Sequence, residues 1–197
     1  MGDLKSVVNF LFEVGILSKT PRSGFYFLGS GKQSVAEHVN RVTFIGYALA
    51  MIDGTVDVGR VLKMCLLHDI AEARTSDLNY VHQKYINAKE TEALKDLAST
   101  LPFGEDMLQL LREYNDRKTP EALYAKDADQ LELILSLKEQ SDVGNTRADT
   151  WFEPVFQRLQ TDLSKSLARQ IFNTGSDEWW HINKQDKWWI TGNKEKI

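Results

Sequence analysis

The sequence predicts an all-α protein. Apolar residues return at intervals of three and four along most of the chain, and no segment alternates strictly between apolar and polar residues. The apolar stretches are separated by residues that typically start or stop helices. The 197 residues are enough for one domain with a substantial core. We therefore expect a single helical bundle.

The first part of the chain is predicted to hold one amphipathic helix and a loop. Apolar residues at helical spacing begin at Leu4, and the helix is expected to end near residues 15–18. Pro21 and Gly24 mark the following segment as a loop. The apolar residues 25–28 are too few to assign to an element.

Two helices are predicted next. Residues 34–37 (Ser-Val-Ala-Glu) fit a capping box, and we prefer this helix-starting role for Glu37 over a catalytic one. The helix is expected to run to about Met51, because the stop signal Asp-Gly follows at residues 53–54. The next helix contains the apolar run at residues 61–67.

The second half of the chain is predicted to hold further amphipathic helices. The clearest start is Thr119-Pro120, which combines an N-cap residue with proline at the first helical position. The last helix is expected to be long and continuous. The expected helices span residues 87–99, 107–114, 119–135 and 155–171.

The C-terminal segment is expected to be distinct from the helical domain. We place the domain at residues 1–173 and the tail at residues 174–197, which contain four of the five tryptophans. Large aromatic residues seldom stay in water without a function. The tail is therefore expected to fold back on the domain, cover the mouth of a site or form a dimer contact.

Composition narrows the class of protein. The chain is 42% hydrophobic and 26% charged with a net charge of −4, which does not suggest a surface for a nucleic-acid polymer. Its single cysteine, Cys65, excludes a disulfide framework within one chain and favours a reducing, cytoplasmic setting. We interpret it as a small core residue. No secretory signal is expected, and no apolar stretch reaches the roughly 20 residues that cross a bilayer.

The stretch His68-Asp69 is the strongest candidate for chemistry. It ends an apolar helix, where unpaired polar groups cost free energy, and a divalent metal ion would satisfy both side chains. Helical spacing places Glu72 on the same face as His68, with Asp69 about 100° round the helix. A local hydrogen bond at the helix end is the alternative interpretation.

Other residues strengthen the metal interpretation. His38 lies on the apolar face of the preceding helix, and two antiparallel helices joined by a short turn could bring its ring to His68. A satisfied core histidine is the alternative. Asp127 and Asp129 are two residues apart on one helix, so they point in different directions and only one is expected to reach the site.

The order His38, then His68-Asp69, then a late aspartate resembles the H…HD…D pattern of the HD-domain superfamily of metal-dependent phosphohydrolases. The blocks at residues 34–38, 68–77 and 126–131 are similar to those of the HD-domain 5′-nucleotidases, the YfbR-like and HDDC2-like branch. The resemblance covers roughly residues 4 to 172. It implies a helical HD domain, a nucleotide substrate and a homodimer.

The resemblance also implies roles for individual residues. Glu72 is the expected acid–base catalyst, Asp77 the residue that binds a sugar hydroxyl and Arg22 the residue that binds the 5′-phosphate. In the bacterial deoxynucleotidases an aromatic residue follows that arginine, whereas here Ser23 follows, so strict selection of deoxyribose is not implied. Asp77 could instead cap a turn. The implied metal ligands are His38, His68, Asp69 and Asp129.

The predicted function is removal of the 5′-phosphate from nucleoside or deoxynucleoside 5′-monophosphates, with one divalent metal ion. Two imidazoles and two carboxylates suit Mn²⁺, Co²⁺, Fe²⁺ or Zn²⁺ better than Mg²⁺. The alternatives are another phosphoester, such as a cyclic nucleotide, a dinucleotide or a guanosine polyphosphate, and a non-catalytic nucleotide sensor. The chain has only four histidines, and His82 and His181 are poorly placed for a second metal. Glu72 argues against a sensor, which needs no acid–base carboxylate.

Overall fold

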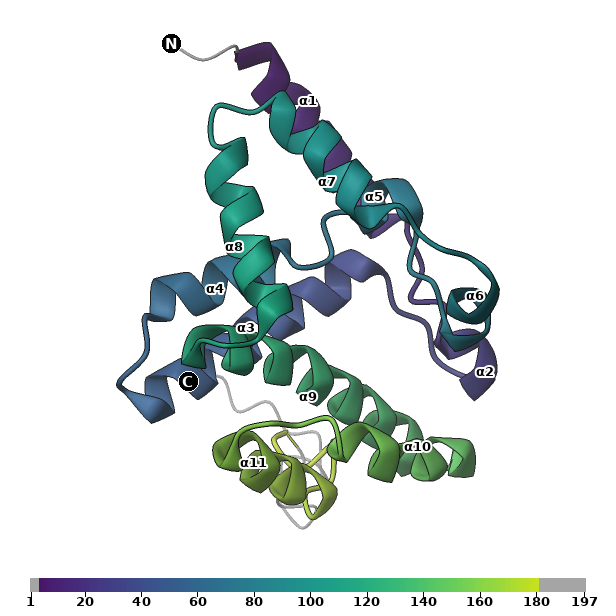
Figure 1. The fold of residues 1–197 in the computed structure, drawn as a ribbon. Coiled ribbons are helices and arrows are strands. Elements are labelled where there is room, and N and C mark those ends of the chain that lie inside the picture. The colour runs from purple at the N-terminus through teal and green to yellow at the C-terminus, as the bar shows by residue number, and fades with distance from the viewer. Residues whose placement is uncertain (1–3, 181–197) are drawn as a thin grey trace, which may run out of the picture.

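The computed structural model describes residues 4–180, which form a helical bundle (Figure 1). No β-strand occurs among these residues, so the predicted all-α class is confirmed. The helices in chain order are α1 (Leu4–Val14), the 3₁₀ helix η1 (Gly15–Ser18), α2 (Phe25–Leu28), α3 (Val35–Asp53), α4 (Val58–Leu67), α5 (Glu72–Thr75), α6 (Tyr80–Tyr85), α7 (Glu90–Ser99), α8 (Gly104–Asp116), α9 (Pro120–Asp142), α10 (Thr146–Phe156) and α11 (Asp162–Phe172).

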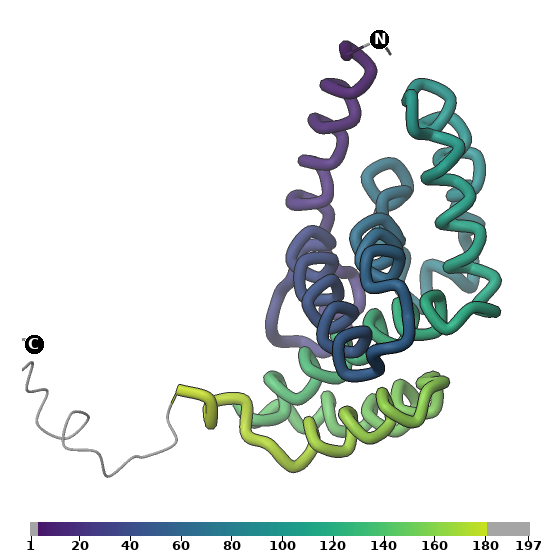
Figure 2. The backbone as a smooth tube through the Cα atoms, turned by 90° about the vertical axis from the view of Figure 1, so that its left-hand side faces the viewer, coloured from purple at the N-terminus to yellow at the C-terminus, as the bar shows by residue number. Residues whose placement is uncertain are grey.

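The long helix α9 lies at the centre of the fold. Helices α3 and α4 pack on one side of it and α10 and α11 on another, while α1 and the α7–α8 pair project from one end of this core (Figures 1 and 2). Leu131, Ile134 and Leu137 of α9 are completely buried in the main apolar cluster. A second cluster joins η1 and the start of α3 to α7 and α8. The candidate site residues of α3 and α9 are thereby set on rigid helices.

The predicted helix starts are confirmed where the sequence carries a capping signal. The Ser34 hydroxyl accepts a hydrogen bond from the Glu37 amide, and the Glu37 carboxylate accepts one from the Ser34 amide at 2.6 Å. Glu37 is thus occupied by the capping box. The side chain of Thr119 caps α9, which begins with Pro120.

The prediction of one long helix over residues 155–171 is wrong. Helix α10 ends at Phe156 and α11 begins at Asp162, so residues 157–161 belong to neither helix. The carboxylate of the buried Asp127 accepts hydrogen bonds from the amides of Gln160 and Thr161, both at 2.9 Å. These bonds stabilise a non-helical turn, which apolar spacing alone does not reveal.

Short helices were also missed by the sequence analysis. Residues 25–28 form one helical turn, α2, and α6 occupies residues that carry no clear period. The side chain of Asn79 starts α6 by accepting hydrogen bonds from the amides of Val81 and His82. Helices this short depend on such local bonds and tertiary contacts rather than on an apolar stripe.

Helices α3 and α4 approach each other closely at Gly46. A Cβ atom on Gly46 would lie only 2.5 Å from the Sγ atom of Cys65. Cys65 is completely buried, as expected for a small core residue. The absence of a side chain at Gly46 therefore determines how near these two helices can pack.

Within residues 4–180, no helix combines the length and the apolar character needed to cross a bilayer.

The tail begins shortly after α11. Trp179 lies in a turn beyond α11 and is 81% exposed. The expectations for Trp188, Trp189 and His181 fall on residues outside the described part of the chain.

Candidate active site

Three helical segments bring the four predicted metal ligands together. His38 comes from α3, His68 and Asp69 from the turn that follows α4, and Asp129 from α9. The Nε2 atom of His38 lies 3.4 Å from Nε2 of His68, 3.5 Å from Oδ2 of Asp69 and 3.3 Å from Oδ1 of Asp129. Nε2 of His68 lies 3.2 Å from Oδ2 of Asp69. The ligand atoms of His38, His68 and Asp69 thus lie within 4.8 Å of one another, and Asp129 adjoins this group through His38.

The turn that holds His68 and Asp69 differs from the helical spacing that the sequence analysis assumed between His68 and Glu72. Helix α4 ends at Leu67, and α5 begins at Glu72. Between them the amides of Ile70 and Glu72 donate to carbonyls three residues earlier, so this stretch is wound more tightly than an α-helix. Glu72 therefore reaches the site from the first residue of a separate helical turn.

The hydrogen bonds of the two imidazoles fit a cation. Nδ1 of His68 lies 2.8 Å from the carbonyl oxygen of Cys65, and Nδ1 of His38 lies 2.6 Å from the carboxylate of Glu132. Because these oxygens only accept hydrogen bonds, each Nδ1 carries a proton, and Nε2 is the nitrogen that each ring presents to the shared point. The predicted alternative for His68, a local hydrogen bond, therefore occurs at Nδ1, while Nε2 faces His38 and Asp69.

The charges around the site also favour a cation. Burial and Arg22 oppose protonation of His38, yet its hydrogen bonds with Asp129 and Glu132 raise its pKa to about 9. Burial opposes ionisation of Asp69, yet the neighbouring His68 holds its pKa well below the ordinary value. The donor set is two nitrogens and two ionised oxygens, which matches a divalent ion of the first transition row.

Asp129 is oriented by partners on its own helix. Its Oδ2 atom accepts hydrogen bonds from Nζ of Lys126 at 2.7 Å and from Nε2 of Gln130 at 3.0 Å. The other oxygen remains directed at His38. Asp127 instead faces the turn before α11. Only one of the two aspartates reaches the cluster, as their spacing predicts.

Glu72 is the unusual carboxyl group of the site. Its Oε2 atom is buried and has no hydrogen-bond partner among residues 4–180. Burial, together with the charges of Asp69 and Asp77, raises its pKa to about 10. Glu72 therefore carries a proton at neutral pH and can donate it.

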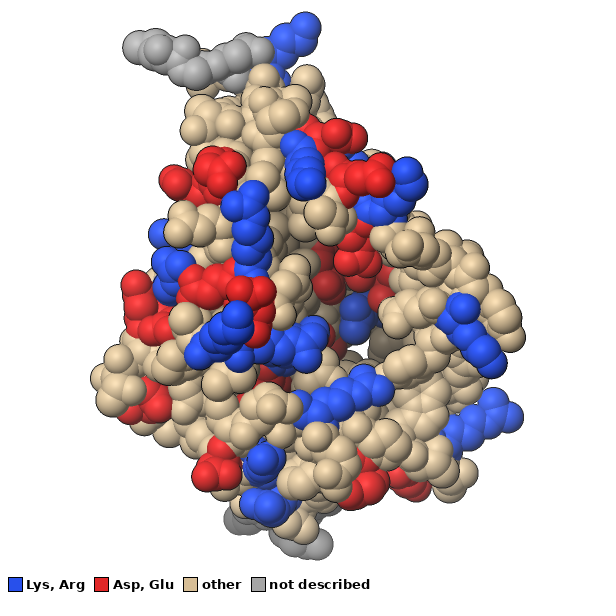
Figure 3. Space-filling model, viewed as in Figure 1, with Lys and Arg blue, Asp and Glu red and all other residues tan. Residues whose placement is uncertain are grey.

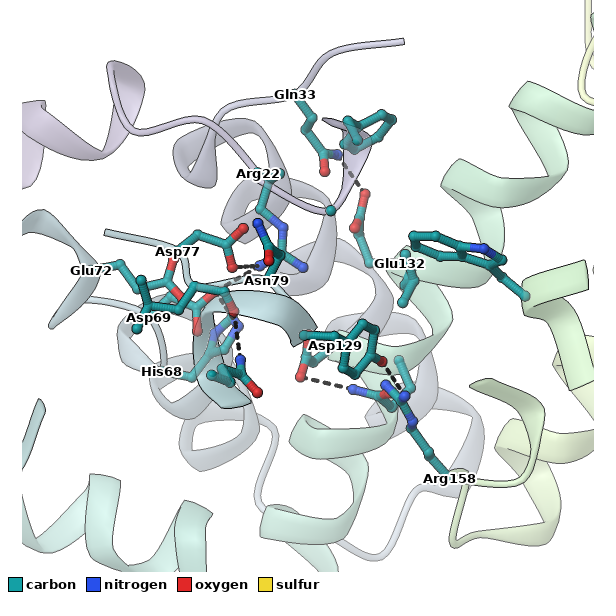
Figure 4. Close-up of a pocket in the computed structure, with 18 of the residues that line it drawn as sticks. Arg22, Gln33, His68, Asp69, Glu72, Asp77, Asn79, Asp129, Glu132 and Arg158 are labelled. Atoms are coloured by element: carbon teal, nitrogen blue, oxygen red, sulfur yellow. Dashed lines mark hydrogen bonds and ion pairs between the residues drawn. The ribbon is translucent and has the colours of Figure 1, made fainter. Parts of the chain in front are cut away.

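Arg22 and Asp77 lie beside the metal-ligand cluster. Nη1 of Arg22 is 3.5 Å from a carboxylate oxygen of Asp69 and 3.5 Å from one of Asp77 (Figure 4). The amide of Ser23 donates to Oδ2 of Asp77 at 2.6 Å, and the Ser23 hydroxyl donates to the Asp77 carbonyl at 2.8 Å. Asp77 thus ties two loops together, while the capping role proposed for it belongs to Asn79.

These residues line a cavity of about 340 Å³. It opens as a hollow on the face of the molecule shown in Figure 3, where acidic and basic side chains lie close together. Its polar lining includes His68, Asp69, Glu72, Asp77, Asp129, Arg22, Lys126 and Arg158, and its apolar lining includes Phe25, Leu28, Leu133 and Trp151. A ligand with a charged end and a flat, largely apolar end fits this lining.

Some residues of the cavity were missed by sequence reasoning. Glu132 follows Asp129 by three positions on α9, so the charged residue within the apolar run at residues 131–135 was an available signal. Arg158 stacks on the ring of Tyr80 and comes from the turn between α10 and α11, which was predicted to be helical. Its position could not be found without that turn.

Comparison with known proteins gives consistent matches. A family model described as an HD domain matches residues 14–171. The cattle (Bos taurus) protein named 5′-deoxynucleotidase HDDC2 is 31% identical over 147 residues, which cover 72% of this chain and 71% of the relative. The Schizosaccharomyces pombe protein named 5′-deoxynucleotidase hdd1 is 30% identical over 191 residues, covering 91% of this chain and 96% of the relative.

A solved structure has the same fold. The conserved hypothetical protein from Pyrococcus furiosus superposes with a TM-score of 0.69 at 29% identity, covering 85% of this chain and 99% of that one. The residues matched by the family model, 14–171, include all four predicted metal ligands. The chain therefore belongs to the HD-domain family, in the branch that contains the HDDC2 proteins.

Proposed function

We propose that this protein is a metal-dependent phosphohydrolase that removes the 5′-phosphate from nucleoside and deoxynucleoside 5′-monophosphates. The observation that carries the proposal is the convergence of two imidazoles and two carboxylates at a cavity that also holds a protonated carboxyl group and an arginine. The names of the cattle and fission-yeast relatives support a nucleotide as the substrate.

The proposed metal ligands are His38, His68, Asp69 and Asp129. Two ionised carboxylates balance the charge of one divalent ion, and the mixed nitrogen and oxygen donors favour Mn²⁺, Co²⁺, Fe²⁺ or Zn²⁺ over Mg²⁺. When bound, such an ion supplies Lewis acidity toward a phosphoryl oxygen and lowers the pKa of water. Within residues 4–180, His38, His68 and Asp69 form the one group of three or more histidine, cysteine or carboxylate side chains whose ligand atoms lie close together, which favours a site for a single metal.

The remaining site residues have roles that follow from their chemistry. Arg22 presents a planar guanidinium group that binds two phosphate oxygens at once. As the oxygen of a water molecule bonds to phosphorus and the bond between phosphorus and the 5′-oxygen breaks, Glu72 donates its proton to that 5′-oxygen and can regain one from the attacking water. Asp77, held by Ser23, accepts a hydrogen bond from a sugar hydroxyl. The products are a nucleoside and inorganic phosphate.

The proposal is tested by measuring phosphate release from a panel of ribo- and deoxyribonucleoside 5′-monophosphates. Metal-stripped protein is supplied with Mn²⁺, Co²⁺ or Mg²⁺. We expect metal-dependent release that is lost in His68→Ala and kept in the control His82→Ala, which alters a histidine of α6 outside the cluster. The ratio of deoxyribose to ribose turnover reports the selectivity that accompanies Ser23.

Absence of release with every metal and nucleotide would contradict the proposal. Diesters, guanosine polyphosphates and direct nucleotide binding are then the next substrates and assays to try. Tight nucleotide binding without turnover would support the alternative of a non-catalytic nucleotide sensor.

We further propose that the protein is a cytoplasmic homodimer whose interface includes the outer face of α3. Phe44, Tyr47 and Met51 follow one another on that face and are 67%, 47% and 56% exposed. The opposite face of α3 is also apolar and lies in the core. A helix that is apolar on both faces is normally covered on both, so a second copy is expected to bury this stripe.

The dimer is tested by sedimentation velocity. Phe44→Asp is expected to weaken self-association at least about tenfold, because burying an unpaired charge costs more than the roughly 1.4 kcal/mol that tenfold represents. The control is Val143→Asp, which places the same charge on an exposed apolar residue at the end of α9. A wild-type protein that stays monomeric at tens of micromolar contradicts the proposal.

The domain boundary is likewise a proposal. Helix α11 ends at Phe172, which supports a helical domain of residues 1–173 followed by a tail of residues 174–197. The amide of Ser176 donates to the carboxylate of Asp142 at 2.8 Å, so the first residues of the tail contact the end of α9. We propose that the tail packs on the domain or joins the dimer contact.

A further inference from the structure

Glu132 is a buried carboxylate beside the metal-ligand cluster with no role in the mechanism described above. Its side chain is 1% exposed, and that of His38 is completely buried. Oε2 of Glu132 lies 2.6 Å from Nδ1 of His38, on the side of the ring opposite the cluster. The carboxylate therefore contacts a predicted metal ligand without facing the metal site.

The second oxygen of Glu132 is surrounded by hydrogen-bond donors. Oε1 accepts from Nε and Nη2 of Arg41 at 2.9 and 2.8 Å, from Nε2 of Gln33 at 2.7 Å (Figure 4) and from the hydroxyl of Ser136 at 3.1 Å. Arg41 is itself held by Ser136 and by Glu139. The arrangement leaves the carboxylate no freedom to turn away from His38.

We propose that Glu132 is a positioning residue that keeps the proton of His38 on Nδ1 and directs the lone pair of Nε2 at the metal. This inference rests on the metal site of the proposed function. A histidine whose second nitrogen bonds to a carboxylate is a more basic ligand than one bonded to a carbonyl. His38, paired with Glu132, is therefore the stronger nitrogen donor, and His68, paired with the carbonyl of Cys65, is the weaker one.

An amide cannot replace this carboxylate. The glutamine of Glu132→Gln can lie in two orientations. If its amide oxygen faces His38, its NH₂ group faces the donors of Arg41 and Gln33, which then lose their acceptor at this position. In the opposite orientation the NH₂ group faces Nδ1, which must then accept, and the proton of His38 moves to Nε2, where it blocks the lone pair. The first orientation loses the bonds that hold the side chain against His38, and the second removes the lone pair from the metal, although the side chain keeps its size.

The first test measures the affinity for Zn²⁺ by competition with a chelating dye. Glu132→Gln is expected to bind Zn²⁺ about 10- to 100-fold more weakly than the wild type, the usual effect of losing such a partner. The matched control is Asp127→Asn. It changes an equally buried carboxylate of α9 whose partners are amides before α11, so it is expected to lower thermal stability and leave Zn²⁺ affinity unchanged.

The second test needs no variant. In ¹⁵N NMR spectra of the zinc-loaded wild type, His38 is expected to carry its proton on Nδ1 and to bind zinc through Nε2. Zinc bound through Nδ1 of His38, or a folded Glu132→Gln protein with wild-type zinc affinity, overturns the inference. If Glu132→Gln does not fold, the wild-type spectrum decides.

Neither measurement uses a nucleotide, so failure of the proposed activity is distinguishable from failure of this inference. A protein that binds zinc as described and hydrolyses no nucleotide leaves the role of Glu132 intact. A wild type that binds no zinc overturns both.

Discussion

Asp129→Asn is expected to lower metal-dependent phosphate release by at least about 10³-fold, whereas Asp127→Asn keeps turnover near the wild-type value. Asp129 directs one oxygen at the imidazole of His38 inside the cluster. A bound ion contributes several kcal/mol of transition-state stabilisation, and each 1.36 kcal/mol is a factor of ten in rate. The lost charge and ligand therefore account for the expected drop, which is measured as kcat/KM at saturating metal.

Asp127→Asn is the matched comparison, because the two residues are two positions apart on α9. Asp127 accepts hydrogen bonds from two amides and from the hydroxyl of Thr161. Its loss is expected to cost about 1–3 kcal/mol of unfolding free energy, measured in urea, because a buried donor is left poorly paired. Equal losses of turnover in both variants would show that α9 is needed for folding and would refute a distinct role for Asp129.

Glu72→Gln is expected to lower kcat by about 10²- to 10⁴-fold with little change in KM. The amide has the same shape as the protonated carboxyl group but cannot give up a proton to the leaving oxygen. Steady-state kinetics with the preferred nucleotide measures the effect, and zinc content checks that the cluster still binds metal. A variant that turns over as fast as the wild type excludes Glu72 as the proton donor.

The pH profile gives an independent check on Glu72. Burial first, and then the charges of Asp69 and Asp77, raise its pKa to about 10. A raised pKa means that the carboxyl group holds its proton below that pH and loses it above. Wild-type kcat is therefore expected to fall as the pH rises toward 10, and that fall is expected to be absent from the residual activity of Glu72→Gln.

Much of the candidate site could be predicted because its residues sit where strong local signals fix the helices. The capping box at Ser34 sets the register of α3, which determines that His38 faces inward. The spacing of two between Asp127 and Asp129 is enough to show that they face different neighbours. In these cases the direction of each side chain depends on the periodicity of a single helix, which can be read from the spacing of residues in the sequence.

The parts that failed depend on contacts between distant segments. The break before α11 exists because Asp127 binds amides more than 30 positions later, and apolar spacing across residues 155–171 gives no sign of it. Because that turn was not predicted, the position of Arg158 at the cavity was not predicted either. Glu132 was overlooked for a different reason. A charged residue on a mostly buried helix needs a polar partner, and the partner of Glu132 is His38, which lies on the distant helix α3.

The close contact between Gly46 and Cys65 has a consequence for how the metal site arises. Gly46 is two helical turns from His38, and Cys65 is one turn from His68, so the separation of the two imidazoles is inherited from the separation of α3 and α4. Helix separation depends on the size of the side chains at the point of contact. The residues at positions 46 and 65 therefore help to set the distance between the two imidazoles, and with it the size of the ion that both could bind, although neither residue is a predicted ligand.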